Sequence, residues 1–175
     1  MRTRIEKEPL VTMLRSALED HREVYGLIYG ICEEKNYIIT SAQPIVSAIR
    51  KPSEVNPERL DFDRIEILTS SEEALLGNYH SHIKIRTKEG WAEPSRCFSK
   101  ADKESLKSEG GLALLLTIED AKREHPWKLI DDSKRLSGAF RTNKGLHRLV
   151  LSAYYLSPQK RIRLSRIDIN TKKLT

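Results

Sequence analysis

The most constraining feature of the sequence is an almost uninterrupted apolar run from Leu112 to Ile118, in which Thr117 is the one polar residue. Such a run is typical of a strand buried on both faces, because alternate side chains of a strand point to opposite sides of a sheet. Gly110 and Gly111 stand directly before it and predict the end of a helix that begins at Ser99. We therefore expect a central strand that is preceded by a helix.

Hydrophobic periodicity predicts further elements on both sides of this strand. Amphipathic spacing favours a helix over 9–21, and a second helix is expected over 57–74. Strands are expected at 23–31, 36–45, 75–82, 127–130, 136–141, 146–156 and 161–169. In the first of these, Gly26 and Gly30 indicate a close backbone approach or a bulge. The mixture of helices and strands predicts an α/β protein with a central mixed β-sheet.

The composition bounds the class of protein. A chain of 175 residues with 38% hydrophobic and 32% charged residues fits a single domain, 1–175, whose core needs no disulfides. Cys32 and Cys97 are too few for a disulfide framework. No segment approaches the ~18 consecutive apolar residues of a membrane-spanning helix, and the first residues lack the apolar run of a secretory signal. We therefore expect a cytoplasmic protein without a membrane partner.

The chain carries a formal net charge of +6, and the excess lies in residues 91–175, which hold 18 Lys and Arg against 10 Asp and Glu. Arg161, Arg163 and Arg166 are expected to alternate along one strand. A basic balance favours acidic partners. Few aromatic residues accompany these arginines, which argues against a nucleic acid as the partner.

The histidines of the predicted strand 75–82 are the main candidates for chemistry. His80 and His82 are separated by one residue, so on a strand both imidazoles point to the same side. Two nitrogen ligands on a rigid strand are a usual beginning of a zinc site. Asp102, in the first turn of the helix that begins at Ser99, is the best candidate for a third ligand. Ser99 and Asp102 also fit a capping box, which by itself would account for both residues.

Together these residues resemble the JAMM motif of the MPN-domain metalloproteases. The resemblance spans roughly residues 8–140 and includes the order of the expected elements. It rests on a glutamate at the head of the first expected strand, a His-Ser-His triplet and a Ser-x-x-Asp segment: Glu23, His80-Ser81-His82, and Ser99 with Asp102. The resemblance implies one MPN-like domain in which a mixed β-sheet is flanked by helices.

The same resemblance implies a zinc-dependent isopeptidase or peptidase that cleaves ubiquitin-like conjugates or C-terminal precursors. One zinc ion per chain would be held by His80, His82 and Asp102. Glu23 would act as the general base, and Ser99 would donate a hydrogen bond to the oxyanion. Ser81 points away from the histidines on a strand, so it is expected to support the backbone.

The sequence departs from the family pattern after the second histidine. Ile83 replaces the usual proline, and the connection Ile83–Phe98 that follows is longer than in the family. We expect this connection to be an irregular loop that gates access to the site, so that shortening it raises activity on a small peptide. Its Trp91 is a candidate substrate contact. Cys97 is either an additional metal ligand or a thiol that simply packs.

Three alternatives remain open. The first is an MPN-type scaffold that binds partners without catalysis, and the second is a basic nucleic-acid-binding protein. The third keeps the enzyme but changes the substrate to a sulfur-carrier-like small protein or a C-terminal peptide extension. For the enzyme, the basic balance of the chain predicts an acidic protein partner.

Overall fold

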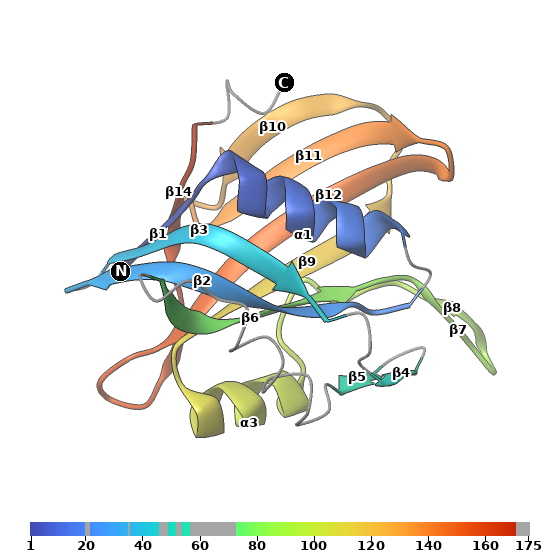
Figure 1. Ribbon diagram of the computed structural model, residues 1–175. Helices are drawn as coiled ribbons and strands as arrows, with labels where there is room; N and C mark the ends of the chain where they lie inside the picture. Colours follow the sequence, from blue (N-terminus) through green and yellow to red (C-terminus); the bar gives the residue numbers. More distant parts are fainter. Residues whose placement is uncertain (20–21, 35, 46–48, 52–53, 57–72, 171–175) are drawn as a thin grey trace.

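The computed structural model describes residues 1–19, 22–34, 36–45, 49–51, 54–56 and 73–170 (Figure 1). Its elements, in chain order, are β1 (Arg2–Ile5), α1 (Lys7–Glu19), β2 (Tyr25–Glu33), β3 (Asn36–Pro44), β4 (Ile49–Lys51), β5 (Glu54–Asn56), β6 (Ala74–His82), β7 (Ile85–Thr87), β8 (Gly90–Ala92), α3 (Lys100–Glu109), β9 (Leu112–Asp120), β10 (His125–Ile130), β11 (Arg135–Thr142), β12 (Gly145–Leu156), β13 (Ile162–Leu164) and β14 (Arg166–Asp168).

One strongly curved sheet of ten strands forms most of the described structure. Its strand order is β10-β11-β12-β9-β6-β2-β3-β1-β14, with β13 paired to β12, while β4–β5 and β7–β8 form two separate hairpins. The backbone N–H of Ile167 in β14 donates a 2.6 Å hydrogen bond to the carbonyl of Ser133, in the turn between β10 and β11. The two ends of the sheet therefore come together, and the sheet is a nearly closed, barrel-like structure.

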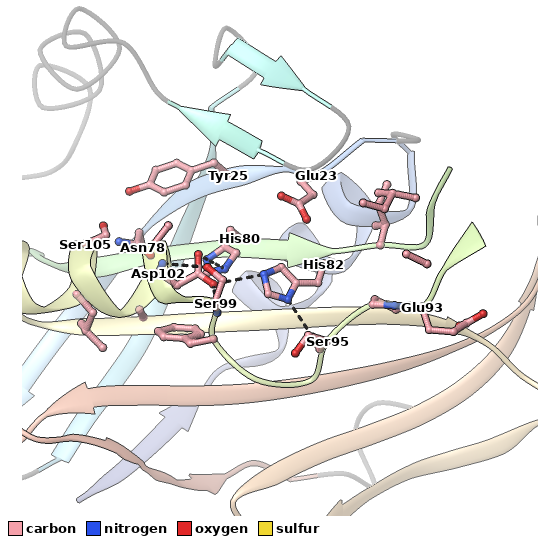
Figure 2. A pocket seen from close by; sticks show the side chains of 18 of the residues that line it. Glu23, Tyr25, Asn78, His80, His82, Glu93, Ser95, Ser99, Asp102 and Ser105 are labelled. Atoms are coloured by element: carbon pink, nitrogen blue, oxygen red, sulfur yellow. Dashed lines mark hydrogen bonds and ion pairs between the residues drawn. The ribbon is translucent and has the colours of Figure 1, made fainter. Parts of the chain in front are cut away.

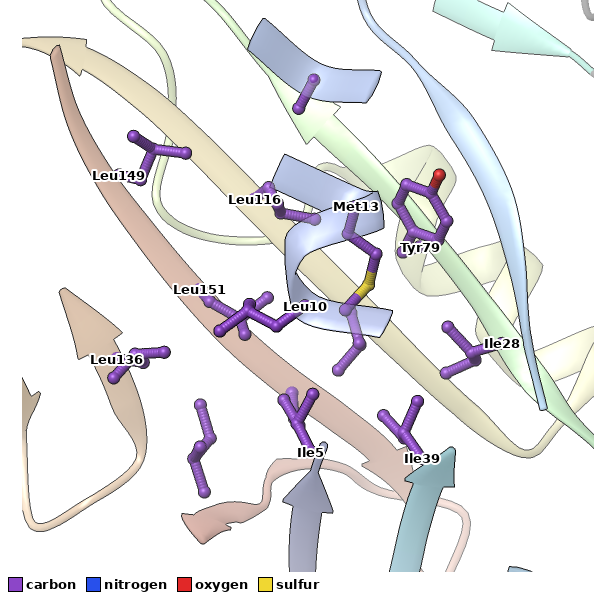
Figure 3. Packing of buried hydrophobic residues seen from close by; sticks show 14 of the residues in the cluster. Ile5, Leu10, Met13, Ile28, Ile39, Tyr79, Leu116, Leu136, Leu149 and Leu151 are labelled. Carbon is purple, nitrogen blue, oxygen red and sulfur yellow. The ribbon is translucent and has the colours of Figure 1, made fainter. Parts of the chain in front are cut away.

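Helix α1 covers the concave side of this sheet (Figure 1). Its fully buried Leu10 and Met13 point toward residues from several strands, among them Ile28, Tyr79 and Leu116 (Figure 3). Burying such side chains stabilises the fold by roughly 1.5–3 kcal/mol each. The helix therefore fills the space that the curved sheet encloses.

Strand β9 confirms the expectation that began with its apolar run. Leu112, Leu114 and Leu116 belong to the core beneath α1, whereas Ala113 and Leu115 pack on the opposite face in a second cluster. Leu106 of α3 lies in that second cluster. The central strand is thus covered by one helix on each face, as its lack of alternation between apolar and polar residues predicts.

The other expected strands are confirmed to within a few residues, except that the strand expected at 161–169 is divided into β13, which pairs with β12, and β14, which pairs with β1. At Gly30 the pairing of β2 with β3 shifts register, which is the expected bulge. A Cβ atom at Gly26 would lie 2.2 Å from the ring of Tyr79, so there the backbone needs glycine for a close approach.

The expected α/β class, with a mixed sheet flanked by helices as in an MPN domain, is wrong. The described chain holds two helices, of 13 and 10 residues, against a ten-stranded sheet, so the protein is mostly β. The unit β6–α3–β9 does join parallel strands through a helix, but β10 to β13 follow one another as antiparallel neighbours, and β9 pairs antiparallel with β12. The sheet encloses its core by curling, where an α/β sheet would cover both of its faces with helices.

Three smaller expectations have different outcomes. The connection after β6 holds the β7–β8 hairpin and is therefore not wholly irregular. The three arginines of the last expected strand are divided, because Arg163 lies on β13 and Arg166 on β14, while Arg161 precedes both. The helix expected over 57–74 lies almost entirely outside the described residues.

In the part of the chain that the structure describes, no helix is long and apolar enough to cross a membrane.

Leu114 and Leu75 offer a matched test of this packing. Leu114 is 0% exposed in β9, whereas Leu75 in the neighbouring strand β6 is 56% exposed. Leu114→Ala should lower the free energy of unfolding by about 2–5 kcal/mol, because it leaves a cavity in the core. Leu75→Ala should lower it by less than about 1 kcal/mol. Urea denaturation of both variants measures the difference, and equal losses would contradict the assigned faces of the sheet.

Candidate metal centre

Strand β6 presents two different faces at its carboxyl end. Tyr79 and Ser81 point into the core beneath α1 and are 0% exposed. His80 and His82 point to the opposite face, toward α3 (Figure 2). Their ring centres lie 5.2 Å apart, and His80 also packs 5.5 Å from the ring of Phe98. The alternation expected of a strand thus places both imidazoles on one side, in contact with fixed neighbours.

Helix α3 brings a carboxylate to these imidazoles. Ser99 is its N-cap: the hydroxyl accepts a 3.1 Å hydrogen bond from the backbone N–H of Asp102, and the backbone N–H of Ser99 donates 2.6 Å to Asp102 Oδ2. This capping box fixes the orientation of the carboxylate. The N-terminal end of the helix dipole also favours a negative charge at this position.

The three side chains form a compact group of possible metal ligands. One ligand atom from each of His80, His82 and Asp102 can be chosen so that all three lie within 4.8 Å of one another. Asp102 Oδ1 is 3.3 Å from His80 Nε2, and Oδ2 is 3.5 Å from His82 Nε2. Apart from this approach of Asp102, the buried Nε2 atom of His80 has no hydrogen-bond partner among the described residues. Two imidazoles and one carboxylate are a donor set that zinc uses, and an unsatisfied buried nitrogen fits a ligand atom.

The connection after β6 supports the second histidine. His82 Nδ1 lies 2.9 Å from the carbonyl oxygen of Ser95, and Thr117 donates to the same oxygen at 3.3 Å. In a neutral imidazole whose proton sits on Nδ1 and is donated to this carbonyl, Nε2 keeps its lone pair for a metal ion. Arg96 holds the segment against the sheet through an ion pair with Glu119. The C-terminal part of the connection is therefore part of the site's support.

Glu23 faces the same group from the start of β2. The N–H of Val24 donates to Ser81 Oγ at 2.9 Å, and the N–H of Ser81 donates to the carbonyl of Val24 at 3.0 Å. This pairing continues the β2–β6 register and sets Glu23 opposite His82, as Figure 2 shows. It also confirms that Ser81 supports the backbone.

The surroundings change the acidity of the carboxyl groups. Burial raises the pKa of Glu23 to about 7, against the opposing effect of His82, and the negative charge of Asp102 raises it further. Burial also acts to raise the pKa of Asp102, but the adjacent imidazoles of His80 and His82 outweigh it and hold that pKa well below its usual range. A carboxyl group with a pKa near neutrality exchanges its proton readily at physiological pH.

These residues line one pocket of about 610 Å³. Besides the residues named above, its wall includes five polar side chains that the sequence patterns did not single out: Tyr25, Asn78, Glu93, Ser105 and Glu109. For three of them, the spacing in the sequence already indicates that they share a face with a candidate ligand. Asn78 lies two residues before His80 on the same strand face, and Ser105 and Glu109 follow Asp102 at intervals of three and seven, on one face of a helix.

The structure brings together the five residues that the motif resemblance singled out, namely Glu23, His80, His82, Ser99 and Asp102, in this single pocket. The two other candidates lie elsewhere. Trp91 is 64% exposed on the β7–β8 hairpin and is not part of the pocket wall. Cys97 is exposed, with its sulfur 4.0 Å from Arg135, and does not belong to the three-residue group.

Comparisons with known proteins give a likeness of fold. The chain matches no known protein family, and no curated protein matches its sequence. Among solved structures, it is similar to the solution structure of protein DSY2949 from Desulfitobacterium hafniense, with a TM-score of 0.59 and 16% sequence identity. The match covers 97% of this chain and 93% of that protein.

Ser81 provides a test of how β2 and β6 hold the site together. Ser81→Ala leaves the buried N–H of Val24 without its side-chain acceptor. We expect the free energy of unfolding to fall by about 1–3 kcal/mol, the cost of an unsatisfied buried donor. Ser108→Ala, which removes an exposed hydroxyl from α3, is the matched control and should cost less than about 0.5 kcal/mol. Similar losses in the two variants would contradict the proposed support.

Proposed function

We propose that the protein is a zinc-dependent hydrolase of peptide or isopeptide bonds. One zinc ion per chain is held by His80, His82 and Asp102, and Glu23 is the general base. The proposal rests on the site residues and their likeness to the JAMM motif, and it takes nothing from the MPN fold. Because the supporting features lie in the site, the proposal is compatible with a mostly-β chain.

The observation that carries the proposal is the convergence of four groups from three segments of the chain. Among the described residues the buried His80 Nε2 has no hydrogen-bond partner, and it points into a space shared with His82 and Asp102. Glu23 faces that space from the adjacent strand. A capping box alone accounts for Ser99 and Asp102, but it does not account for two imidazoles and a second carboxylate directed at the same point.

Each residue has a role that its surroundings support. A zinc ion held here supplies Lewis-acid chemistry and makes water nucleophilic near neutral pH. Glu23 accepts the proton that water loses as it attacks the carbonyl carbon, and delivers that proton to the nitrogen atom as the C–N bond breaks. The Ser99 hydroxyl accepts one hydrogen bond from the helix, so its own proton is available for the developing oxyanion. The products are a carboxylic acid and an amine.

The substrate class follows from the motif resemblance and from the shape of the pocket. We propose a ubiquitin-like or sulfur-carrier-like small protein, cleaved at a conjugate or at a C-terminal precursor. A pocket of about 610 Å³ beside the end of β6 has room for several residues of an extended chain end. Glycines near the scissile bond would suit such a pocket, because a bare backbone can approach the metal closely.

Metal content tests the ligand set. The protein purified in the presence of zinc should retain about one zinc ion per chain after dialysis. His80→Ala should weaken zinc binding at least tenfold, because a direct ligand is removed. His125→Ala, on β10 at the far edge of the sheet, is the matched control and should retain the metal. Elemental analysis measures this, and full zinc retention by His80→Ala would contradict the site.

Glu23 tests the chemistry separately from the metal. Glu23→Gln should bind zinc as the wild type does, but it should cleave a ubiquitin-like fusion about 10²–10⁴-fold more slowly, because no base remains to move the proton. Glu33→Gln, an exposed position at the other end of β2, should leave both properties unchanged. Normal cleavage by Glu23→Gln would show that the mechanism is wrong.

A further inference from the structure

The pocket extends from the candidate metal centre in two directions. Tyr25, Asn78 and Ser105 lie on one side of His80 and Asp102, and Glu93 lies on the other side, beyond His82 (Figure 2). The first direction follows α3 toward its C-terminus, where Glu109 completes the wall. A substrate segment that runs along α3 would therefore pass from the metal centre to Glu109.

The charge of the pocket is opposite to that of the chain. Although the chain carries a formal net charge of +6, the described residues that line the pocket include four carboxylates and no lysine or arginine. Glu93 forms an ion pair with Lys84 at 3.0 Å, and Lys84 also pairs with Asp120 at 2.8 Å. Glu23 and Asp102 both face the imidazoles of the metal centre. Glu109 is the remaining carboxylate.

Glu109 is exposed, and among the described residues its carboxylate accepts hydrogen bonds from neutral donors only. Ser105 Oγ donates to Glu109 Oε1 at 2.7 Å, and Asn78 Nδ2 donates to Oε2 at 3.2 Å. In the described part of the chain, Glu109 makes no ion pair. It also lies in the last turn of α3, where the helix dipole disfavours a negative charge. Burial, together with the nearby charge of Glu109, raises the pKa of Tyr25, so the phenol beside it stays neutral.

We propose that Glu109 binds a lysine or arginine side chain of the substrate segment that occupies this pocket. The inference rests on the proposed peptidase function and adds a specificity-determining residue to it. A carboxylate that is oriented by two hydrogen bonds, and that has no cationic partner among the described residues, presents free lone pairs to an incoming ammonium or guanidinium group. The net charge of the chain predicts an acidic partner, but the segment of that partner inside the pocket should carry a positive charge.

The position of the cation follows from helix geometry. Glu109 follows Asp102 by seven positions, which corresponds to a rise of about 10 Å along α3. An extended peptide advances about 3.3 Å per residue. The cationic residue should therefore stand about three residues from the scissile bond, or slightly nearer if its long side chain leans toward Glu109.

Peptide binding to an inactive protein tests this assignment apart from cleavage. The probes are fluorescent octapeptides of alanine and glycine that differ only at one central position, which carries lysine, alanine or glutamate. They are titrated by fluorescence anisotropy into zinc-loaded Glu23→Gln, alone and combined with Glu109→Gln or Glu104→Gln. Glu104 lies on the same helix, near Lys100 and outside the pocket wall, so it is the matched control for the lost charge.

We expect the lysine peptide to bind Glu23→Gln about fivefold more tightly than the alanine peptide, and the glutamate peptide to bind most weakly. Glu109→Gln should abolish this preference, and Glu104→Gln should preserve it. The assignment is overturned if the lysine peptide shows no preference, if the preference survives Glu109→Gln, or if the lysine peptide fails to bind at millimolar concentration. If the preference is present but wild type cleaves no substrate, the proposed hydrolase function fails while the cation site stands.

Discussion

The pairing of β2 with β6 is the constraint on which the rest of the site depends. Ser81 accepts a hydrogen bond from the backbone of Val24 on the core side of the sheet, and this fixes the register in which Glu23 faces His82 on the other side. A shift by one residue would exchange the two faces and turn the imidazoles into the core. The same strand therefore carries both the packing beneath α1 and the candidate metal centre.

Local patterns were sufficient to predict most elements, but they did not predict the architecture. The apolar run of β9 and the period of α1 are signals within a single segment, and both elements lie where those signals indicated. The curl of the sheet depends on contacts between distant segments, such as Ile167 in β14 with Ser133 beside β11. No short-range periodicity records such a contact, so the balance of helices and strands was misjudged as α/β.

The residues of the candidate site likewise include some that a local pattern could predict and some that it could not. His80, His82, Ser99 and Asp102 were predictable because their spacing on one strand and in one helical turn already fixes their directions. The carbonyl of Ser95 was not predictable, since a backbone atom leaves no trace in the residue types, yet it orients His82. Trp91 was chosen for its residue type alone, and it lies outside the pocket wall. Glu109 was missed because the role that we propose for it depends on the sum of charges around one pocket.

The central claim is that two imidazoles and one carboxylate hold a zinc ion between β6 and α3. X-ray absorption spectroscopy at the zinc edge of the zinc-loaded protein tests this claim most directly. The account predicts two imidazole nitrogens at about 2.0–2.1 Å and oxygen ligands at about 2.0–2.2 Å, with no sulfur. Zinc–sulfur scattering at about 2.3 Å, or a first shell of oxygen atoms without imidazole, would contradict it.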